Sequence, residues 1–351
     1  MVLNIWVRRI ATSSVIHAKP LPPNLNIFDR ETKKLQRNRT AYYPDYANYE
    51  YIKSEVGYRV ADRVFDIKRE FNSILDLGCQ RGYVSKNLTK ETVKKLYMFD
   101  ISEKMLEQAD LPEEGIQVEK RNFDEEDDLP FENDSLDLIV SSLNFHWVNN
   151  LPKLFKESIR VLKKDSAIIG AMFAGDTLFE LRVSLQLAEL ERKGFYILIF
   201  LYYLRLDCFP IFFPKGLTPR ISPFTTPQDI GGLLTSNGFT LLTLDFDEIQ
   251  ISYPSIFELM YDLKGMGESN CSWKRKFNLS TDTLMAAQSI YQEMYGNEDG
   301  SIPATYQILY FIAWKPHESQ AKPAKRGSAN VSLKELPKVL EQKKGDTKND
   351  Q

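Results

Sequence analysis

The sequence predicts an α/β protein built on a doubly wound, mostly parallel β-sheet. Short apolar segments alternate with segments of helical periodicity between residues 51 and 173, a pattern typical of such sheets. One apolar segment, residues 73–77, runs directly into a glycine-containing turn, and ligands of these folds lie at the carboxyl ends of the strands. Hydrophobic residues make up 43% of the 351 residues, which is enough for a sizeable core.

Composition and charge exclude several classes of protein. Lys and Arg number 45 against 48 Asp and Glu, a net charge of −3, so the whole chain lacks the strongly basic character expected for a nucleic-acid partner. Its cysteines, Cys79, Cys208 and Cys271, are far apart and form no CxxC pair, which argues against a disulfide framework or a zinc site. The longest apolar run, residues 195–204, has ten residues, whereas a membrane-spanning helix needs about 20. We therefore expect a reducing compartment and no spanning helix.

The two ends of the chain differ in composition from its middle. Residues 1–26 contain no acidic residue, and their apolar residues fall at helical spacing beside Arg8, Arg9 and Lys19. A basic, acid-free amphipathic start is typical of a mitochondrial transit peptide, which we predict over residues 1–25. From residue 319 the chain is polar and rich in lysine, which predicts a disordered tail over 319–351. One domain over residues 26–318 remains.

Periodicity predicts the elements of this domain in order. A charged segment at 28–39 and an amphipathic segment from 51 to before Phe71 are expected to be helices. Apolar segments predict strands at 73–77, 96–100, 116–121, 136–141 and 166–173. Between them we expect helices after the glycine turn through Lys94, at 102–109 and at 151–162. Beyond residue 173 the alternation weakens, with helices expected at 177–192, 228–237, 256–266 and 282–295 and strands at 239–246 and 306–314.

One segment matches neither a helical nor a strand period. Residues 195–213 contain eight aromatic residues in nineteen. They lie within an atypical insert at about 194–216, which is either a buried lid element or foreign to the fold.

The clearest chemical motif is residues 74–82, Ile-Leu-Asp-Leu-Gly-Cys-Gln-Arg-Gly. Glycines let a backbone approach a ligand closely and take positive φ. A dinucleotide fingerprint starting at Gly78 would need glycine where Gln80 and Tyr83 stand, and a P-loop lysine followed by Ser or Thr is missing from the motif. Both of these phosphate-binding motifs are therefore excluded.

The same motif resembles the first motif of S-adenosylmethionine-dependent methyltransferases of the Rossmann-like, seven-stranded class I fold. Asp76, Gly78 and Gly82 match the family's pattern, and Gln80 replaces its middle glycine. The resemblance implies that the cofactor is S-adenosyl-L-methionine, that the glycine turn packs against its methionyl part, and that Asp76 orients its amino group. It also implies a cofactor half at about 51–175 and a substrate or lid half at about 176–318.

Two further segments fit the same cofactor. Asp100 ends a strand 22 residues after Gly78, a position where a carboxylate can accept both ribose hydroxyls. We expect the following Ile101 to lie at the same cofactor site. The alternative for Asp100 is a helix cap. Residues 124–131 resemble the stretch of this superfamily that contacts adenine, in which Glu125 has the usual spacing and Asp124 lies one residue too far from the Leu-Pro-Phe motif. Either carboxylate is a candidate for the adenine amino group.

Longer motifs indicate a narrower family. Residues 140–148 resemble the segment after the fourth strand of BioC-like methyltransferases, which act on malonyl-acyl carrier protein. Residues 170–182, 265–271 and 297–307 are similar to those of the mitochondrial arginine hydroxylases that act as assembly factors of NADH:ubiquinone oxidoreductase, complex I. This resemblance implies hydroxylation of an arginine in an iron–sulfur subunit of complex I, by a protein associated peripherally with the matrix side of the inner membrane.

The sequence offers three candidates for the chemistry beyond the cofactor. His146 follows the fourth strand and is either a base or a packing residue beside Trp147. Asp176 either accepts a substrate guanidinium or caps the following helix, and Arg182 lies where a substrate could reach it. Because His146 has no His-x-Asp/Glu partner, an ordinary two-histidine, one-carboxylate iron site is poorly supported, and we predict no metal ligands.

Three function classes stay open at this point. The first is the arginine hydroxylase, and the second is a methyltransferase that acts on a protein or an acyl carrier. The third is a non-catalytic assembly factor that retains a cofactor site. The fold alone cannot choose among them.

Overall fold

The computed structural model describes residues 26–194, 220–276 and 278–320. The predicted transit peptide, the aromatic insert from residue 195 and the tail from residue 321 lie outside the described residues. No helix in the described ranges is long and apolar enough to span a bilayer.

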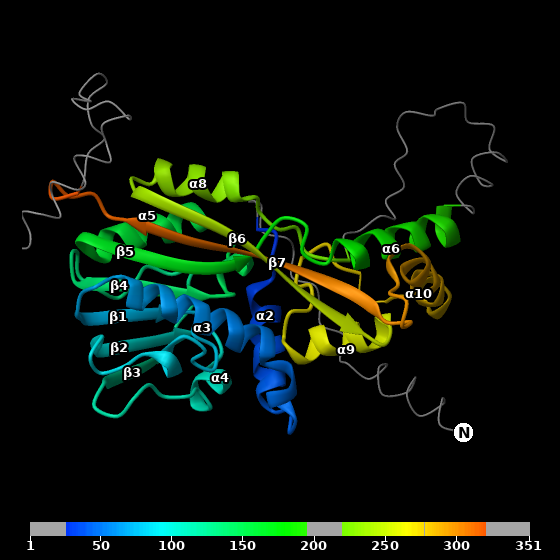
Figure 1. Cartoon of the computed structure of the whole chain (residues 1–351), viewed down its shortest axis with the longest axis horizontal. Coiled ribbons are helices and arrows are strands. Elements are labelled where there is room, and N and C mark those ends of the chain that lie inside the picture. The colour runs from blue at the N-terminus through cyan, green and yellow to red at the C-terminus, as the bar shows by residue number, and fades with distance from the viewer. Residues whose placement is uncertain (1–25, 195–219, 277, 321–351) are drawn as a thin grey trace, which may run out of the picture. The chain divides into compact units, whose positions relative to one another are not determined.

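A seven-stranded sheet forms the centre of the fold (Figure 1). Its strand order is β3-β2-β1-β4-β5-β7-β6, and β7 runs antiparallel to both β5 and β6. The strands are β1 (Phe71–Leu77), β2 (Val93–Asp100), β3 (Gln117–Asn122), β4 (Leu136–Ser142), β5 (Leu162–Phe173), β6 (Thr240–Tyr253) and β7 (Ile302–Trp314). This arrangement confirms the predicted fold class, a doubly wound, mostly parallel sheet of the Rossmann-like class I methyltransferase type.

Helices cover both faces of the sheet because successive strand residues point to opposite sides. Ile74 packs with α3 (Tyr51–Asp66) on one face, and its neighbour Leu75 packs with α5 (Leu151–Val161) and α8 (Pro227–Ser236) on the other. The strands β1 and β4 are buried on both faces, as expected for the centre of a parallel sheet. The two hydrophobic cores therefore fix β1 and β4, and with them the turn that follows β1.

Three further helices lie at the antiparallel pair β6–β7, and α2 lies elsewhere. Figure 1 shows α6 (Phe179–Glu189), α9 (Ile256–Gly265) and α10 (Thr281–Tyr295) together at one end of this pair. The helix α2 (Arg30–Ala41) lies near α4 (Glu103–Glu107). A single-turn helix, η3 (Phe145–Trp147), follows β4.

The predicted helix between the glycine turn and Lys94 is wrong. Only one short 3₁₀ turn, Ser85–Asn87, forms there, and β2 already begins at Val93. The side-chain amide of Asn87 donates to the carbonyl of Tyr83 at 2.8 Å, which is the acceptor that a helical backbone bond from residue 87 would use. Side-chain bonds of this kind compete with the helix.

Candidate functional site

The glycine turn leaves the buried end of β1 and is tied to β2. The backbone N–H groups of Gly78 and Cys79 both donate to the carbonyl of Phe99, at 2.7 and 3.0 Å. Gly78 has φ +75° and Gly82 φ +78°, a region in which residues with a Cβ are strained. A Cβ on Gly78 would also lie 2.0 Å from Nδ2 of Asn144. Backbone conformation and space therefore both require glycine at this position.

Asp76 lies one residue before the end of β1 and is completely buried. Its Oδ2 accepts a hydrogen bond from the Ser85 hydroxyl at 2.6 Å, while its Oδ1 has no hydrogen-bond partner. Burial raises the pKa of Asp76 to about 7. An unpartnered buried carboxylate oxygen costs free energy, and a ligand ammonium group would satisfy it. The unpartnered acceptor at this position thus fits the amino group of S-adenosyl-L-methionine.

Asp100 ends β2 and is buried next to the same turn. Its Oδ1 accepts from the backbone N–H of Ser102 at 2.7 Å, and its Oδ2 accepts from the backbone N–H of Gln80 at 3.0 Å. Ser102, and not Asp100, caps α4, because its hydroxyl accepts from the N–H of Met105. The cap alternative for Asp100 is therefore wrong. The neighbouring Ile101 is also buried.

The two candidates for the adenine contact both face α2. Arg30 forms ion pairs with Glu125 and, at 2.9 Å, with Asp124. Glu125 is buried and its Oε1 also accepts from the side-chain amide of Asn144 at 3.0 Å, whereas the Asp124 side chain is 31% exposed. The structure thus brings Asp124 and Glu125 together with Asp100 through α2 and Asn144.

Three cations of α2, Arg30, Lys33 and Arg37, are buried, and sequence reasoning missed them. Arg37 donates to Asp100 at 3.1 Å and to Oδ1 of Asn144 at 2.6 Å. The Lys33 ammonium lies 3.4 Å from the centroid of the Trp147 ring, and burial lowers the pKa of Lys33 to about 8. With Arg30, these residues occupy one helix face at spacings of three and four, a signal that places them together but does not indicate that they are buried.

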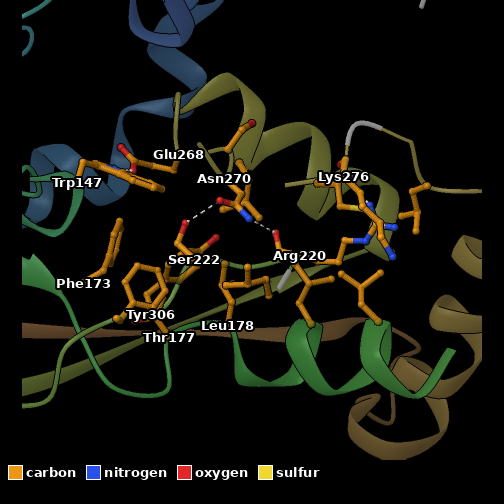
Figure 2. A pocket seen from close by; sticks show the side chains of 18 residues that line it. Trp147, Phe173, Thr177, Leu178, Arg220, Ser222, Glu268, Asn270, Lys276 and Tyr306 are labelled. Carbon is orange, nitrogen blue, oxygen red and sulfur yellow. Dashed lines mark hydrogen bonds between the residues drawn. The ribbon is translucent and has the colours of Figure 1, made fainter. Parts of the chain in front are cut away.

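A cavity of about 250 Å³ lies on the side of Trp147, between η3, the end of β5 and α6 (Figure 2). Its lining is mostly apolar and includes Trp147, Phe173 and Tyr306. We call this cavity the chamber. It is smaller than the roughly 300–1,000 Å³ of pockets for drug-sized ligands. The chamber therefore suits one amino-acid side chain better than a whole cofactor.

Glu268 is the carboxylate among the described residues that line the chamber. It accepts from the Trp147 indole at 2.7 Å and pairs with the buried Lys53 ammonium at 2.9 Å. Burial alone would raise the pKa of Glu268, but Lys53 and His146 outweigh it and hold that pKa well below its usual range. Glu268 is thus an ionised carboxylate in an aromatic wall, and neither its role nor that of Lys53 was predicted.

His146 lies behind this wall. Its Nε2 is 3.4 Å from Glu268, and its ring contacts those of Trp147 and Phe173. Burial lowers the pKa of His146, which favours the neutral ring, and its Nδ1 has no hydrogen-bond partner. The ring packs against aromatic neighbours, as expected for a packing residue. It also lies next to a carboxylate, as expected for a base.

The other two catalytic candidates lie apart from this wall. The side chain of Asp176 caps no helix, because α6 begins at Phe179 without a side-chain cap, so the predicted cap is wrong. Asp176 is exposed, and Arg182 donates to the carbonyl of Thr177 at 3.2 Å. Neither side chain is among the described residues that line the chamber. In the described part of the chain, no group of three or more His, Cys, Asp and Glu is arranged to hold a metal ion.

Comparisons with known proteins agree with this architecture. A methyltransferase domain model matches residues 75–170. The chain is 50% identical over 335 residues to "Arginine-hydroxylase NDUFAF5, mitochondrial" of Mus musculus, with 95% of this chain and 90% of the relative covered. It is also 50% identical over 336 residues to the protein of that name from Homo sapiens, with the same coverage.

A more distant relative carries the second resemblance drawn from the motifs. The malonyl-[acyl-carrier protein] O-methyltransferase of Halorhodospira halophila is 26% identical over 265 residues, which cover 75% of this chain and 81% of the relative. The names of the mouse and human relatives agree with the predicted mitochondrial location. On the strength of the 50% identity over nearly the whole chain, this protein belongs to the NDUFAF5 arginine-hydroxylase family, whose members share the methyltransferase fold.

Proposed function

We propose that this protein hydroxylates an arginine side chain of a protein substrate in mitochondria. The observation that carries the proposal beyond family membership is the chamber, in which an ionised carboxylate, Glu268, lies beside the Trp147 and Phe173 rings. A guanidinium group pairs with carboxylates and stacks on aromatic rings. Its alkyl stem suits the apolar part of the wall, which includes Leu178 and Leu181. The substrate arginine enters the chamber and its guanidinium faces Glu268.

The family resemblance supports a specific substrate and process. We propose an iron–sulfur subunit of complex I as the substrate and complex I assembly as the process. The reaction takes place on the matrix side of the inner membrane, with the protein bound peripherally. Protease protection in mitoplasts followed by carbonate extraction tests this location, since a matrix-side peripheral protein is protected from protease and is then extracted.

The cofactor site belongs to the same proposal. Asp76, the turn at Gly78 and Gly82, and Asp100 would hold S-adenosyl-L-methionine, with Asp124 or Glu125 at the adenine. The cofactor, when bound, supplies an electrophilic methyl group, so methyl transfer to a protein or an acyl carrier is the second candidate function. The observation that favours it is the unpartnered Oδ1 of Asp76, which fits the amino group of that cofactor.

The mass of an arginine peptide distinguishes these functions. The purified protein is incubated with the iron–sulfur subunit, S-adenosyl-L-methionine as the methyl donor, dioxygen and a two-electron donor. The last two are needed because in hydroxylation one oxygen atom enters the substrate while the other leaves as water. Hydroxylation adds one oxygen, about 16 Da, whereas methylation adds about 14 Da. The mass change therefore identifies which group the protein has positioned at the substrate and transferred. No mass change, with assembly still dependent on the protein, would favour a non-catalytic assembly factor.

The variant Glu268→Gln tests the assignment of the chamber. It keeps the shape of the side chain and removes its charge, so we expect a loss of substrate turnover of about 10- to 100-fold, the effect of one lost charged contact of about 1.5–3 kcal/mol. Glu293→Gln, at an exposed position of α10, is the matched control. Equal turnover of the two variants would contradict the proposed role of Glu268.

A further inference from the structure

We propose that α2 competes with the cofactor: its Arg37 holds the carboxylate that the cofactor needs, so the cofactor binds only after α2 has left this position. The inference rests on the proposed cofactor site and concerns its regulation. The helix is part of the described chain, and its contacts at the glycine turn carry the argument.

The first step concerns Asp100. Its two oxygens accept three hydrogen bonds, from Ser102, Gln80 and Arg37. The bonds to Ser102 and Gln80 come from the backbone of the turn and of the strand end, so they remain when a ligand binds. The bond from Arg37 comes from a separate helix and occupies the oxygen that a ribose hydroxyl would use. Arg37 and a ribose therefore compete for Oδ2 of Asp100.

The second step concerns space. Asp76, Asp100 and Gln80 have no exposed surface. None of these three residues is among the described residues that line the chamber, so the chamber does not open onto the turn. Asn144 fills the close approach to Gly78 and is itself held by Arg37. A ligand can reach the turn only if Arg37 and Asn144 move away.

The third step concerns what holds α2. Its buried residues are mainly polar: Arg30, Lys33, Arg37, Thr40 and Ala41. A helix docked by apolar residues would lose hydrophobic stabilisation on leaving, roughly 1.5–3 kcal/mol for each large side chain. A helix docked by ion pairs exposes little apolar surface, and water or a ligand replaces its bonds. Release of α2 is therefore compatible with an intact core.

The fourth step links α2 to the chamber. The Lys33 ammonium donates to the carbonyls of Gly267 and Ser269, at 3.0 and 3.1 Å. Glu268 and Ser269 are part of the chamber wall. The same movement that opens the glycine turn thus removes a support of the chamber, so that cofactor entry and access for the substrate are coupled.

Binding of S-adenosylhomocysteine to the full chain, measured by calorimetry, tests the proposal. Arg37→Ala removes the competitor, and we expect it to bind at least tenfold tighter than the wild type. Arg39→Ala removes an exposed arginine of the same helix and is expected to bind like the wild type. Equal or weaker binding by Arg37→Ala would overturn the proposal, because Arg37 would then be neutral or would help to hold the cofactor.

Hydrogen exchange of the wild-type chain gives a second readout that does not depend on the folding of a variant. Saturating S-adenosylhomocysteine should speed the exchange of the α2 amides and slow that of residues 77–82. Increased protection of α2 would overturn the competition while leaving the cofactor site intact. If neither the wild type nor Arg37→Ala binds the ligand, the proposed cofactor site fails and the competition fails with it. The mass assay for hydroxylation is independent of both outcomes.

Discussion

Asp76 makes the stability of this protein depend on pH in a way that one substitution should remove. Burial raises its pKa from the ordinary 3.8 to about 7. Between these two values the folded chain keeps a proton that the unfolded chain has lost. Folding stability therefore falls as the pH rises through this window. The contribution of Asp76 is fully present below pH 4 and is lost above pH 7.

The size of the effect follows from the shift in pKa. A shift of about 3 units corresponds to ~4 kcal/mol at 1.36 kcal/mol per unit. The variant Asp76→Asn has no proton to lose at this position. Its free energy of unfolding should therefore rise by this amount relative to that of the wild type between pH 4 and 7.5. The gain should not exceed about 1.4 kcal/mol per pH unit, the limit for one proton.

Urea denaturation at four pH values from 4.0 to 7.5, at constant ionic strength, measures this difference. Other titrating groups cancel, because they are common to both proteins. Asp66→Asn, at an exposed position at the end of α3, is the matched control for the loss of one carboxylate. A constant difference between Asp76→Asn and the wild type would refute the reasoning. The same variant should lose affinity for S-adenosylhomocysteine, since stability and binding make opposite demands on this carboxylate.

Three further substitutions give independent tests. Gly78→Ala should cost about 1–3 kcal/mol, since alanine is strained at φ +75° and its Cβ would meet Asn144; an unchanged melting temperature would contradict this. Lys53→Met leaves the Glu268 carboxylate buried without its cation and should cost about 3–5 kcal/mol in urea denaturation, whereas a near-neutral effect would show that the pair adds little. Burial lowers the pKa of Lys33 to about 8, so above that pH the folded chain binds fewer protons than the unfolded chain. The stability of the wild type should therefore rise relative to that of Lys33→Met from pH 8 to 10.5. A difference that does not change over this range would count against the buried ammonium.

The parallel sheet and the glycine turn could be predicted because their signals are local. Ile74 and Leu75 lie in a short apolar run whose two faces are both buried, and such runs indicate a central strand wherever they occur. Gly78 and Gly82 are required by backbone conformation, which depends on few neighbours. Asp76 and Asp100 could be proposed as site residues because they stand at fixed positions relative to these strands.

The cations of α2 could not be predicted, because their burial depends on partners far away in the sequence. Arg37 on a charged helix is ordinarily exposed to solvent, and its burial is compensated by contacts with Asp100 and Asn144, 63 and 107 residues later. Glu268 lies in a segment without periodic signal, and its surroundings come from η3 and α3. The cap predicted at Asp176 failed because the chain makes a turn at Leu178, with φ +55°, before α6 begins.

The position of α2 also determines the order in which the domain can assemble. Lys33 reaches its acceptors on Gly267 and Ser269 across 234 and 236 residues of chain, so these bonds close a loop that contains most of the domain. Closing such a loop before the sheet has formed is entropically costly. We therefore expect α2 to be among the last elements to take its place. Until then, the carboxylates of Asp100, Asp124 and Glu125 lack their α2 partners and can bind another basic segment.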